Sequence, residues 1–266
     1  MIKPYYETPL GKLYHGDCLE IMPELEPVDL VVTSPPYDNL RDYGGYVFDF
    51  ERIAENLYLK VAPGGVVVWV VGDATINGSE TGTSFKQALY FKEIGFNLHD
   101  TMIWNKNGFS AVGSLSVRYA PVFEYMFILT NGNLKTFNPI KDKPNKWAGD
   151  TRKHTMNRQK DGTTTPSKGY VLGEFGQRYN IWDIYAQRQW GGNNHPAPFP
   201  QPLAHDHIIS WSNEGDMVAD IMCGSGTTLK MAEKLNRRWI GIEIEEKYCE
   251  IAAKRIEQER KQLKLF

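Results

Sequence analysis

The sequence predicts an α/β fold built on a mostly parallel, seven-stranded sheet that helices cover on both faces, with a small irregular insertion. Short, unbroken apolar runs such as Val66–Val71 are typical of strands that are buried on both faces of a sheet. These runs alternate with segments whose apolar residues recur at helical spacing, which favours parallel strands joined by helices. A chain of 266 residues with 41% hydrophobic residues can fill the core of one large domain that carries an insertion.

Seven segments are predicted strands, because each is a short run rich in branched or aromatic residues between turn signals. No internal repeat is visible along the series. In chain order the strands are Leu13–Gly16, Val28–Thr33, Val66–Val71, Leu98–Trp104, Val122–Leu129, Met217–Ile221 and Trp239–Glu243.

Five segments are predicted helices. Asp49–Val61 places its apolar residues on one helical face and is followed by the helix breakers Pro63 and Gly64. A second predicted helix ends at Gly95, where a glycine is the usual stop signal. The four helices after the first are Phe85–Ile94, Pro202–Trp211, Thr227–Leu235 and Glu246–Leu263.

The charges are distributed unevenly. Between Lys135 and Trp190, 11 Lys and Arg residues stand against 5 Asp and Glu residues, although the whole chain has a net charge of −2. We divide the chain into a main domain, residues 1–130 with 195–266, and an insertion, residues 131–194. The insertion is either a solvated surface loop or a segment that faces a polyanion. In the second case the phosphate contacts are Lys141, Lys143, Lys146, Arg152, Lys153 and Arg158.

Several classes of protein are excluded by what the sequence lacks. No run approaches the roughly 18 apolar residues of a membrane-spanning helix, and the N-terminus resembles no secretory signal, so we expect a cytoplasmic protein without membrane contact. His205 and His207 flank Asp206, but without a further ligand nearby we expect them to cap or line a helix, and no metal is predicted. The cysteines lie too far apart for a disulfide framework or a metal pair: Cys18, Cys223 and Cys249.

Polar or glycine-rich segments follow four of the predicted strands. Asp17 follows the first strand, Ser34–Tyr37 the second, and Cys223–Thr228 the sixth, while Glu243 ends the seventh. Ligands of open α/β sheets bind beyond the carboxyl ends of the strands. We therefore expect these segments to form one site at one edge of the sheet.

The turn that contains Gly224 and Gly226 resembles a nucleotide-binding loop, because glycines let a ligand approach the backbone at a helix N-terminus. It lacks the lysine of a phosphate-binding P-loop and the third glycine of a dinucleotide-binding motif. Glu243 ends the next strand, where an acidic side chain accepts hydrogen bonds from ribose hydroxyls. Turn and carboxylate together indicate a ligand that contains adenosine.

The segment Ser34-Pro35-Pro36-Tyr37 presents hydrogen-bond acceptors beside an aromatic face. Two prolines remove two N–H donors and leave carbonyl groups that only accept. Such acceptors would hold both N–H bonds of a nucleobase amino group and free its lone pair, while Tyr37 stacks on an extruded base. The alternative is a proline turn that simply ends a strand.

In this order, the segments resemble a β-class DNA amino-methyltransferase, a family in which the target-base motif precedes the cofactor motif. Thr33–Tyr37 resembles the catalytic motif of the family, and Asp220–Thr228 resembles its D-P-F-x-G-S-G-T-T motif. The resemblance implies a Rossmann-like methyltransferase sheet with circularly permuted motif order and a target-recognition role for the insertion. Further matching segments are His15–Leu19, Trp104–Lys106, Tyr179–Ile184, His195–Pro200 and Gly241–Glu243.

The resemblance also implies the cofactor S-adenosylmethionine and a set of site residues. It assigns the catalytic role to Ser34, Pro35, Pro36 and Tyr37. It assigns cofactor contacts to Asp17, Phe199, Asp220, Met222, Cys223, Gly224, Ser225, Gly226, Thr227, Thr228 and Glu243. One departure is that Ile221 and Met222 stand where the family has Pro-Phe, so that an aromatic wall beside the cofactor is missing.

The substrate implied by the resemblance is double-stranded DNA. A serine before Pro-Pro-Tyr favours cytosine N4 as the methylated atom, with adenine N6 as the alternative. A cognate restriction endonuclease and a second copy of the chain are further partners known in the family. The other functions considered are an RNA or protein methyltransferase, a nucleic-acid-binding protein without catalysis, and a dinucleotide oxidoreductase.

Overall fold

The structure is a computed structural model that describes residues 2–36, 48–108, 115–152, 156–166, 169–186 and 200–263. The chain divides into two compact units. The first comprises Met1–Asn138 with Asn180–Phe266 and contains the large sheet and the helices. The second, Pro139–Tyr179, has both of its ends inside the predicted insertion.

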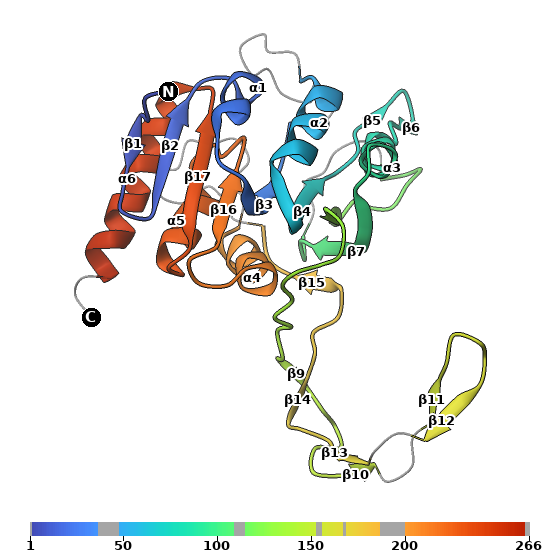
Figure 1. Ribbon diagram of the computed structural model, residues 1–266. Helices are drawn as coiled ribbons and strands as arrows, with labels where there is room; N and C mark the ends of the chain where they lie inside the picture. Colours follow the sequence, from blue (N-terminus) through green and yellow to red (C-terminus); the bar gives the residue numbers. More distant parts are fainter. Residues whose placement is uncertain are drawn as a thin grey trace. The chain divides into compact units, whose positions relative to one another are not determined.

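The described residues of the first unit form a nine-stranded sheet in the order β1-β2-β17-β16-β3-β4-β8-β7-β15 (Figure 1). Neighbours pair in parallel except where β1 or β8 takes part, so the prediction of a mostly parallel α/β fold is confirmed. All seven predicted strands are present, and the short strands β1 and β15 extend the sheet at its two edges. The strands are β1 (Tyr6–Glu7), β2 (Gly11–His15), β3 (Val28–Thr33), β4 (Val61–Val71), β7 (Asn97–Asn105), β8 (Phe123–Thr130), β15 (Ile181–Asp183), β16 (Met217–Asp220) and β17 (Arg238–Glu243).

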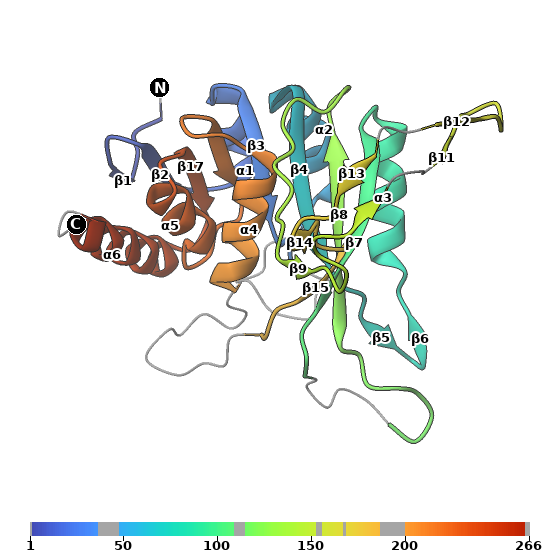
Figure 2. The same cartoon turned by 90° about the horizontal axis from the view of Figure 1, so that it is seen from below.

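Helices cover both faces of the sheet, as predicted (Figure 2). One face packs against α4 (Gln201–Trp211), α5 (Thr227–Lys234) and α6 (Glu246–Leu263). The other packs against α1 (Cys18–Ile21), which leads into the 3₁₀ turn Met22–Glu24, and against α2 (Phe50–Lys60) and α3 (Thr83–Glu93).

The ends of α2 show how the sequence sets an element boundary. The side chain of Asp49 accepts a hydrogen bond from the Arg52 N–H and so caps the helix. At the other end the chain passes from Lys60 directly into β4, which therefore begins before the predicted run Val66–Val71. The predicted helix Asp49–Val61 is thus one residue too long at each end.

The core consists of one apolar layer on each face of the sheet. Trp239 is fully buried in the layer under α4, α5 and α6, and its Nε1 donates to Glu233 Oε2 at 2.6 Å. In the opposite layer, Nε1 of the fully buried Trp69 donates to Gln87 Oε1 at 2.8 Å. Each buried indole therefore keeps a hydrogen-bond partner.

The second unit is a two-stranded β-ribbon, here called the ribbon (residues 139–179). The chain reverses at Gln159, whose N–H donates to Thr163 O at 2.7 Å. None of the described residues of the ribbon is buried, so backbone pairing holds it and no apolar alternation marks its strands. Its antiparallel pairs are β9 (Lys143–Pro144) with β14 (Phe175–Gly176), β10 (Thr151–Arg152) with β13 (Tyr170–Val171), and β11 (Met156–Arg158) with β12 (Thr164–Pro166).

Candidate active site at the carboxyl edge of the sheet

The carboxyl ends of four neighbouring parallel strands meet at one edge of the sheet, here called the carboxyl edge. These strands are β2, β17, β16 and β3 (Figure 1). Two hydrogen bonds join their ends, from Gly16 N–H to Glu243 O at 2.9 Å and from Cys223 N–H to Ile242 O at 2.9 Å. The edge therefore brings together the segments that contain Asp17, Ser34 and Glu243.

The glycine turn between β16 and α5 requires its two glycines. Gly224 has a φ of 51° and Gly226 a φ of 72°, and residues other than glycine rarely adopt such positive φ angles. A Cβ atom on Gly226 would lie 2.6 Å from the Cβ of Ala252 in α6. The turn is thus pressed closely against α6, and it leads directly into the first residue of α5.

Arg255 of α6 supports this turn, and the sequence analysis did not identify it. Its Nη1 donates to the carbonyl and hydroxyl oxygens of Ser225, the latter at 2.7 Å, and to Thr227 Oγ1 at 3.2 Å. Burial lowers the pKa of Arg255, although the side chain remains a cation. One feature of the sequence could have identified Arg255: it lies on the same face of α6 as Ala252 and Ile256, which are both buried.

Glu243 is 7% exposed and faces the glycine turn. Its Oε2 accepts from the Gly224 N–H at 2.7 Å, and its Oε1 accepts from the Glu245 N–H at 2.9 Å. Burial raises the pKa of its carboxyl group, while the two N–H donors oppose that rise. Glu243 thus holds the turn in place and is the predicted ribose ligand.

Asp220 connects the turn to the predicted catalytic strand. It is 6% exposed, and its Oδ1 accepts from Thr33 Oγ1 at 2.8 Å and from the Met222 N–H at 3.3 Å. Burial raises the pKa of Asp220 to about 6, against hydrogen bonds from Thr33 and Thr228 that lower it. The Thr33 bond ties the end of β3 to the end of β16, and Thr228 Oγ1, 3.2 Å from Val32 O, links the first turn of α5 to β3.

Three other predicted cofactor residues have structural contacts of their own. Asp17 caps α1, since its Oδ1 accepts from the Leu19 N–H at 2.8 Å. Met222 packs against the core under α1, α2 and α3. Burial and the nearby carboxylates raise the pKa of Cys223 well above its usual range, so its sulfur stays a thiol.

The predicted catalytic motif begins where β3 ends. Ser34 and Pro36 are half-buried and Pro35 is buried, directly after the buried Thr33. Tyr37 lies outside the described residues, as do Phe199 of the cofactor set and Lys153 of the phosphate set. The described part of the motif therefore stands at the carboxyl edge, one residue from the bond to Asp220.

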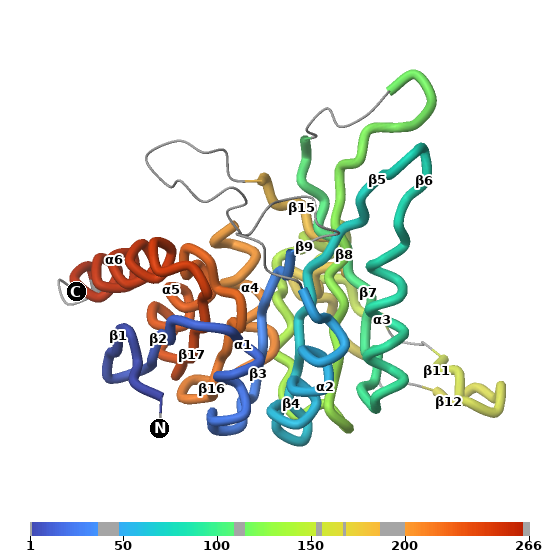
Figure 3. The backbone as a smooth tube through the Cα atoms, turned by 90° about the horizontal axis from the view of Figure 1, so that it is seen from above, coloured from blue at the N-terminus to red at the C-terminus, as the bar shows by residue number. Residues whose placement is uncertain are grey.

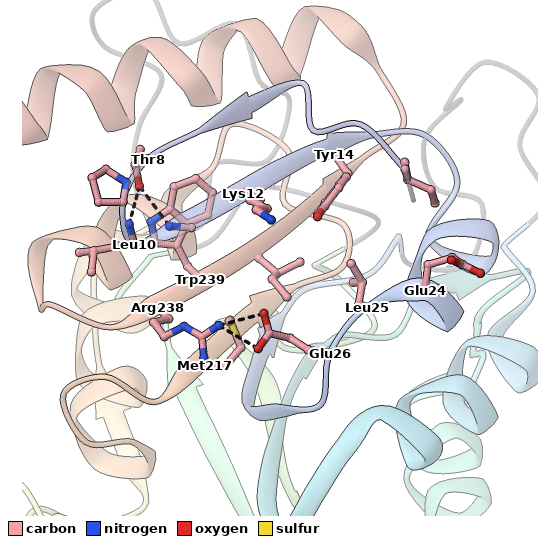
Figure 4. Close-up of a pocket in the computed structure, with 14 residues that line it drawn as sticks. Thr8, Leu10, Lys12, Tyr14, Glu24, Leu25, Glu26, Met217, Arg238 and Trp239 are labelled. Carbon is pink, nitrogen blue, oxygen red and sulfur yellow. Dashed lines mark hydrogen bonds and ion pairs between the residues drawn. The ribbon is translucent and has the colours of Figure 1, made fainter.

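A surface pocket of about 310 Å³ lies elsewhere on the sheet (Figure 4). Met217 and Arg238, the first residues of β16 and β17, line it, together with Lys12 and Glu26. Arg238 Nη2 donates to both carboxylate oxygens of Glu26, at 2.8 and 2.9 Å. The pocket includes the amino ends of two strands and does not include the candidate active site.

The described basic residues predicted to contact phosphate all lie in the ribbon. Lys143 is half-buried, with its Nζ 4.1 Å from the ring centroid of Tyr179. The other described members of the set are exposed: Lys141, Lys146, Arg152 and Arg158.

No helix among the described residues has the length and apolar character needed to cross a membrane.

The α/β fold brings together, at the carboxyl edge, the segments predicted to bind a nucleoside-type cofactor and a target base. Residues 28–254 match the family model described as DNA methylase, which covers N6 and N4 methyltransferases. The chain belongs to this family and is a DNA amino-methyltransferase, as the resemblance implied.

Individual relatives and solved structures agree with this family. The chain is 52% identical over 249 residues to the orphan methyltransferase M.BamHII of Bacillus amyloliquefaciens, an alignment covering 91% of this chain and 90% of that protein. The cytosine-N4-specific PvuII DNA methyltransferase matches with a TM-score of 0.72 at 22% identity, covering 96% of this chain and 89% of that one. A DNA modification methylase structure from Thermus thermophilus, with bound S-adenosylmethionine, matches with a TM-score of 0.63 at 24% identity, covering 93% of each chain.

Proposed function

We propose that this chain transfers a methyl group from S-adenosylmethionine to the exocyclic amino group of a flipped base in double-stranded DNA, with cytosine N4 preferred. The observation that carries the proposal is the 2.8 Å hydrogen bond between Thr33 Oγ1 and Asp220 Oδ1. It joins the strand that leads into Ser34-Pro35-Pro36 to the strand that leads into the glycine turn. A base-binding motif and a cofactor-binding turn are thereby held at a fixed separation.

The residues at the carboxyl edge fit S-adenosylmethionine. The buried Glu243 carboxylate accepts from the backbone N–H groups of Gly224 and Glu245, and a carboxylate offers about four acceptor sites, so capacity remains for a ribose hydroxyl. Asp17, on the neighbouring strand end, would hold the ammonium group, and the turn from Gly224 into α5 would face the methionine part. When bound, S-adenosylmethionine supplies an electrophilic methyl group on a sulfonium sulfur.

The chain's own residues prepare the nitrogen that accepts this methyl group. The lone pair of a base amino group is delocalised into the ring, which makes the nitrogen a weak nucleophile. The Ser34 hydroxyl and the Pro35 carbonyl would accept its two N–H bonds and so favour a pyramidal nitrogen with a localised lone pair. Cys223 takes no part, because direct transfer needs no thiolate and its raised pKa keeps it protonated.

Cytosine N4 is preferred because a serine precedes Pro-Pro-Tyr in this chain. The structural match to a cytosine-N4-specific enzyme supports that choice at the level of the fold. Adenine N6 is the alternative, since both bases present an amino group beside a ring nitrogen at the same edge.

The ribbon is the proposed DNA-recognition element. The major groove of DNA admits a two-stranded β-ribbon, and this ribbon has exposed basic residues on its strands, Arg152 in β10 and Arg158 in β11. Because none of the described side chains of the ribbon is buried, they can gain contacts when the ribbon lies against a nucleic acid. The basic residues would neutralise phosphates and orient the protein on the duplex.

Methylation of unmodified genomic DNA tests the proposal. We expect N4-methylcytosine when the treated DNA is digested to nucleosides and analysed by mass spectrometry. N6-methyladenine as the sole product would overturn the choice of base, and the absence of any methylated base would overturn the function. Ser34→Ala should lower kcat by about 100-fold while changing the Kd for DNA little. The hydrogen bond from the base amino group to the Ser34 hydroxyl is expected to stabilise mainly the transition state.

A further inference from the structure

Two exposed segments stand at the carboxyl edge and include no residue of the proposed site. One is the hairpin of β5 (Thr75–Ile76) and β6 (Ser79–Glu80), which follows β4, and the other is residues 115–119, which precede β8. We call residues 75–80 together with 115–119 the edge ridge. The hairpin and the chain leading into β8 extend side by side from the same edge of the sheet (Figures 2 and 3). Because β4 pairs with β3, the edge ridge begins on the strand next to the one that leads into Ser34.

The edge ridge has a defined geometry of its own. Asn77 and Gly78 form the two-residue turn of the hairpin with φ angles of 50° and 80°, which tight hairpins require. Arg118 ties the second segment to the first, since its Nη1 donates to Thr75 Oγ1 at 3.3 Å and its Nη2 to Gly78 O at 2.8 Å. The two segments therefore form one surface feature.

The edge ridge exposes apolar side chains around a cation. Val117 and Tyr119, on either side of Arg118, are 80% and 99% exposed. Ile76 and Leu115 add side chains that are 53% and 47% exposed, and apolar side chains exposed together on one surface feature favour an interaction site. The two hydrogen-bond acceptors of Arg118 are neutral, and no carboxylate among the described residues forms an ion pair with it.

We infer that the edge ridge is a second DNA contact, in which Val117 and Tyr119 enter the base stack beside the target nucleotide and fill the space that its base leaves. This inference rests on the proposed function. A base has to leave the stack before its amino group can react, and DNA-deforming proteins insert apolar side chains between base steps. Arg118 adds attraction to the phosphates. A duplex whose target base reaches Ser34 passes the neighbouring strand ends, which makes DNA the partner that this surface meets.

The test uses the full chain and two synthetic duplexes, made once the methylated position in genomic DNA has been mapped. One duplex is fully paired, and the other has an abasic site opposite the target base, which removes the pairing that resists extrusion. The variants are Tyr119→Ala and Val117→Ser. The control is Leu59→Ser, which removes a 77% exposed apolar side chain near the end of α2, away from the carboxyl edge. The readout is the rate of transfer of labelled methyl groups.

On the paired duplex we expect Tyr119→Ala to lose about tenfold, a typical effect of removing one stacking aromatic side chain, and Val117→Ser to lose activity through the loss of an apolar wedge. On the abasic duplex each variant should lose less than threefold. Leu59→Ser should match the wild type on both. Equal losses on the two duplexes, or none on the paired one, would overturn the inference. If light scattering shows that the ridge variants change oligomeric state while their rate of methyl transfer stays that of the wild type, the inference would also be overturned. The edge ridge would then be assigned to a protein interface. Wild-type protein that methylates no DNA would instead contradict the proposed function.

Discussion

At the scale of a single residue, the Glu243 carboxylate holds the glycine turn and is also the proposed ligand of the ribose hydroxyls. We predict that Glu243→Ala weakens binding of S-adenosylmethionine by about 1–3 kcal/mol through the loss of charged hydrogen bonds. Isothermal titration calorimetry measures this directly. Glu245→Ala is the matched control, since it removes the neighbouring, more exposed carboxylate and should leave the affinity unchanged. Unaltered cofactor affinity in Glu243→Ala would contradict the assignment.

Asp220 makes stability depend on pH in a defined direction. Its pKa is raised from 3.8 to about 6 by burial, so the folded protein binds this proton more tightly than the unfolded chain does. The stabilisation is present below pH 4 and is lost as the pH rises through about 6, by up to about 3 kcal/mol.

Asp220→Asn should remove this pH dependence, because the amide cannot titrate. We predict that the difference in unfolding free energy between the variant and the wild type grows in favour of the variant from pH 4 to pH 7. Urea unfolding at several pH values gives the difference, in which the other carboxyl groups cancel. A constant difference over that range would show that Asp220 does not have a raised pKa.

These residues also show how far the sequence predicts a site. Glu243 was predicted at the carboxyl edge because it ends a recognisable strand, and Asp220 was assigned to the cofactor site by the family resemblance; both lie at that edge. The bond between Asp220 and Thr33 joins residues 187 positions apart, and no local pattern reports such a pairing. Arg255 was missed for a related reason, since its role depends on how α6 packs against the turn.

At the scale of elements, the strands and helices with a buried face were predictable and the short ones were not. α5 has clear periodicity and begins at Thr227, as predicted. α1 has four residues, and its one sequence signal is the capping side chain of Asp17. The ribbon strands have two or three residues each and no buried face, so composition alone indicated a loop.

The junction of the glycine turn with α6 yields a prediction for that element. Gly226→Ala combines a φ of 72° with a Cβ atom 2.6 Å from Ala252, whereas Gly215→Ala has a φ of 81° and no atom within 4 Å. We expect Gly215→Ala to cost about 1 kcal/mol of stability, and Gly226→Ala a further 1–3 kcal/mol or so from the clash. Urea unfolding compares the two variants. Equal losses of unfolding free energy in the two variants would mean that α6 shifts to make room for the extra methyl group.

At the scale of the whole molecule, the chain combines a unit that has a large core with the ribbon, whose described residues are all at least partly exposed. The sheet and its helices bury two apolar layers, and this packing holds the strand ends at the carboxyl edge in place. The ribbon has no buried residue among those described, and its pairing is a ladder of short strands. The proposed roles differ accordingly, with catalysis on the packed unit and DNA recognition on the ribbon.

This division predicts how DNA binding responds to salt. If Arg152 and Arg158 each neutralise one phosphate, replacing either with alanine should lower the log–log salt slope of binding by about 0.9, and replacing both by about twice that amount. Fluorescence anisotropy with a labelled duplex at several salt concentrations gives the slope. Lys254→Ala is the control, because it removes the same charge from the exposed face of α6 and should leave the slope as it is. Ribbon variants whose affinity and slope both match the wild type would exclude the ribbon as a phosphate-binding element, since each released counterion has to appear in that slope.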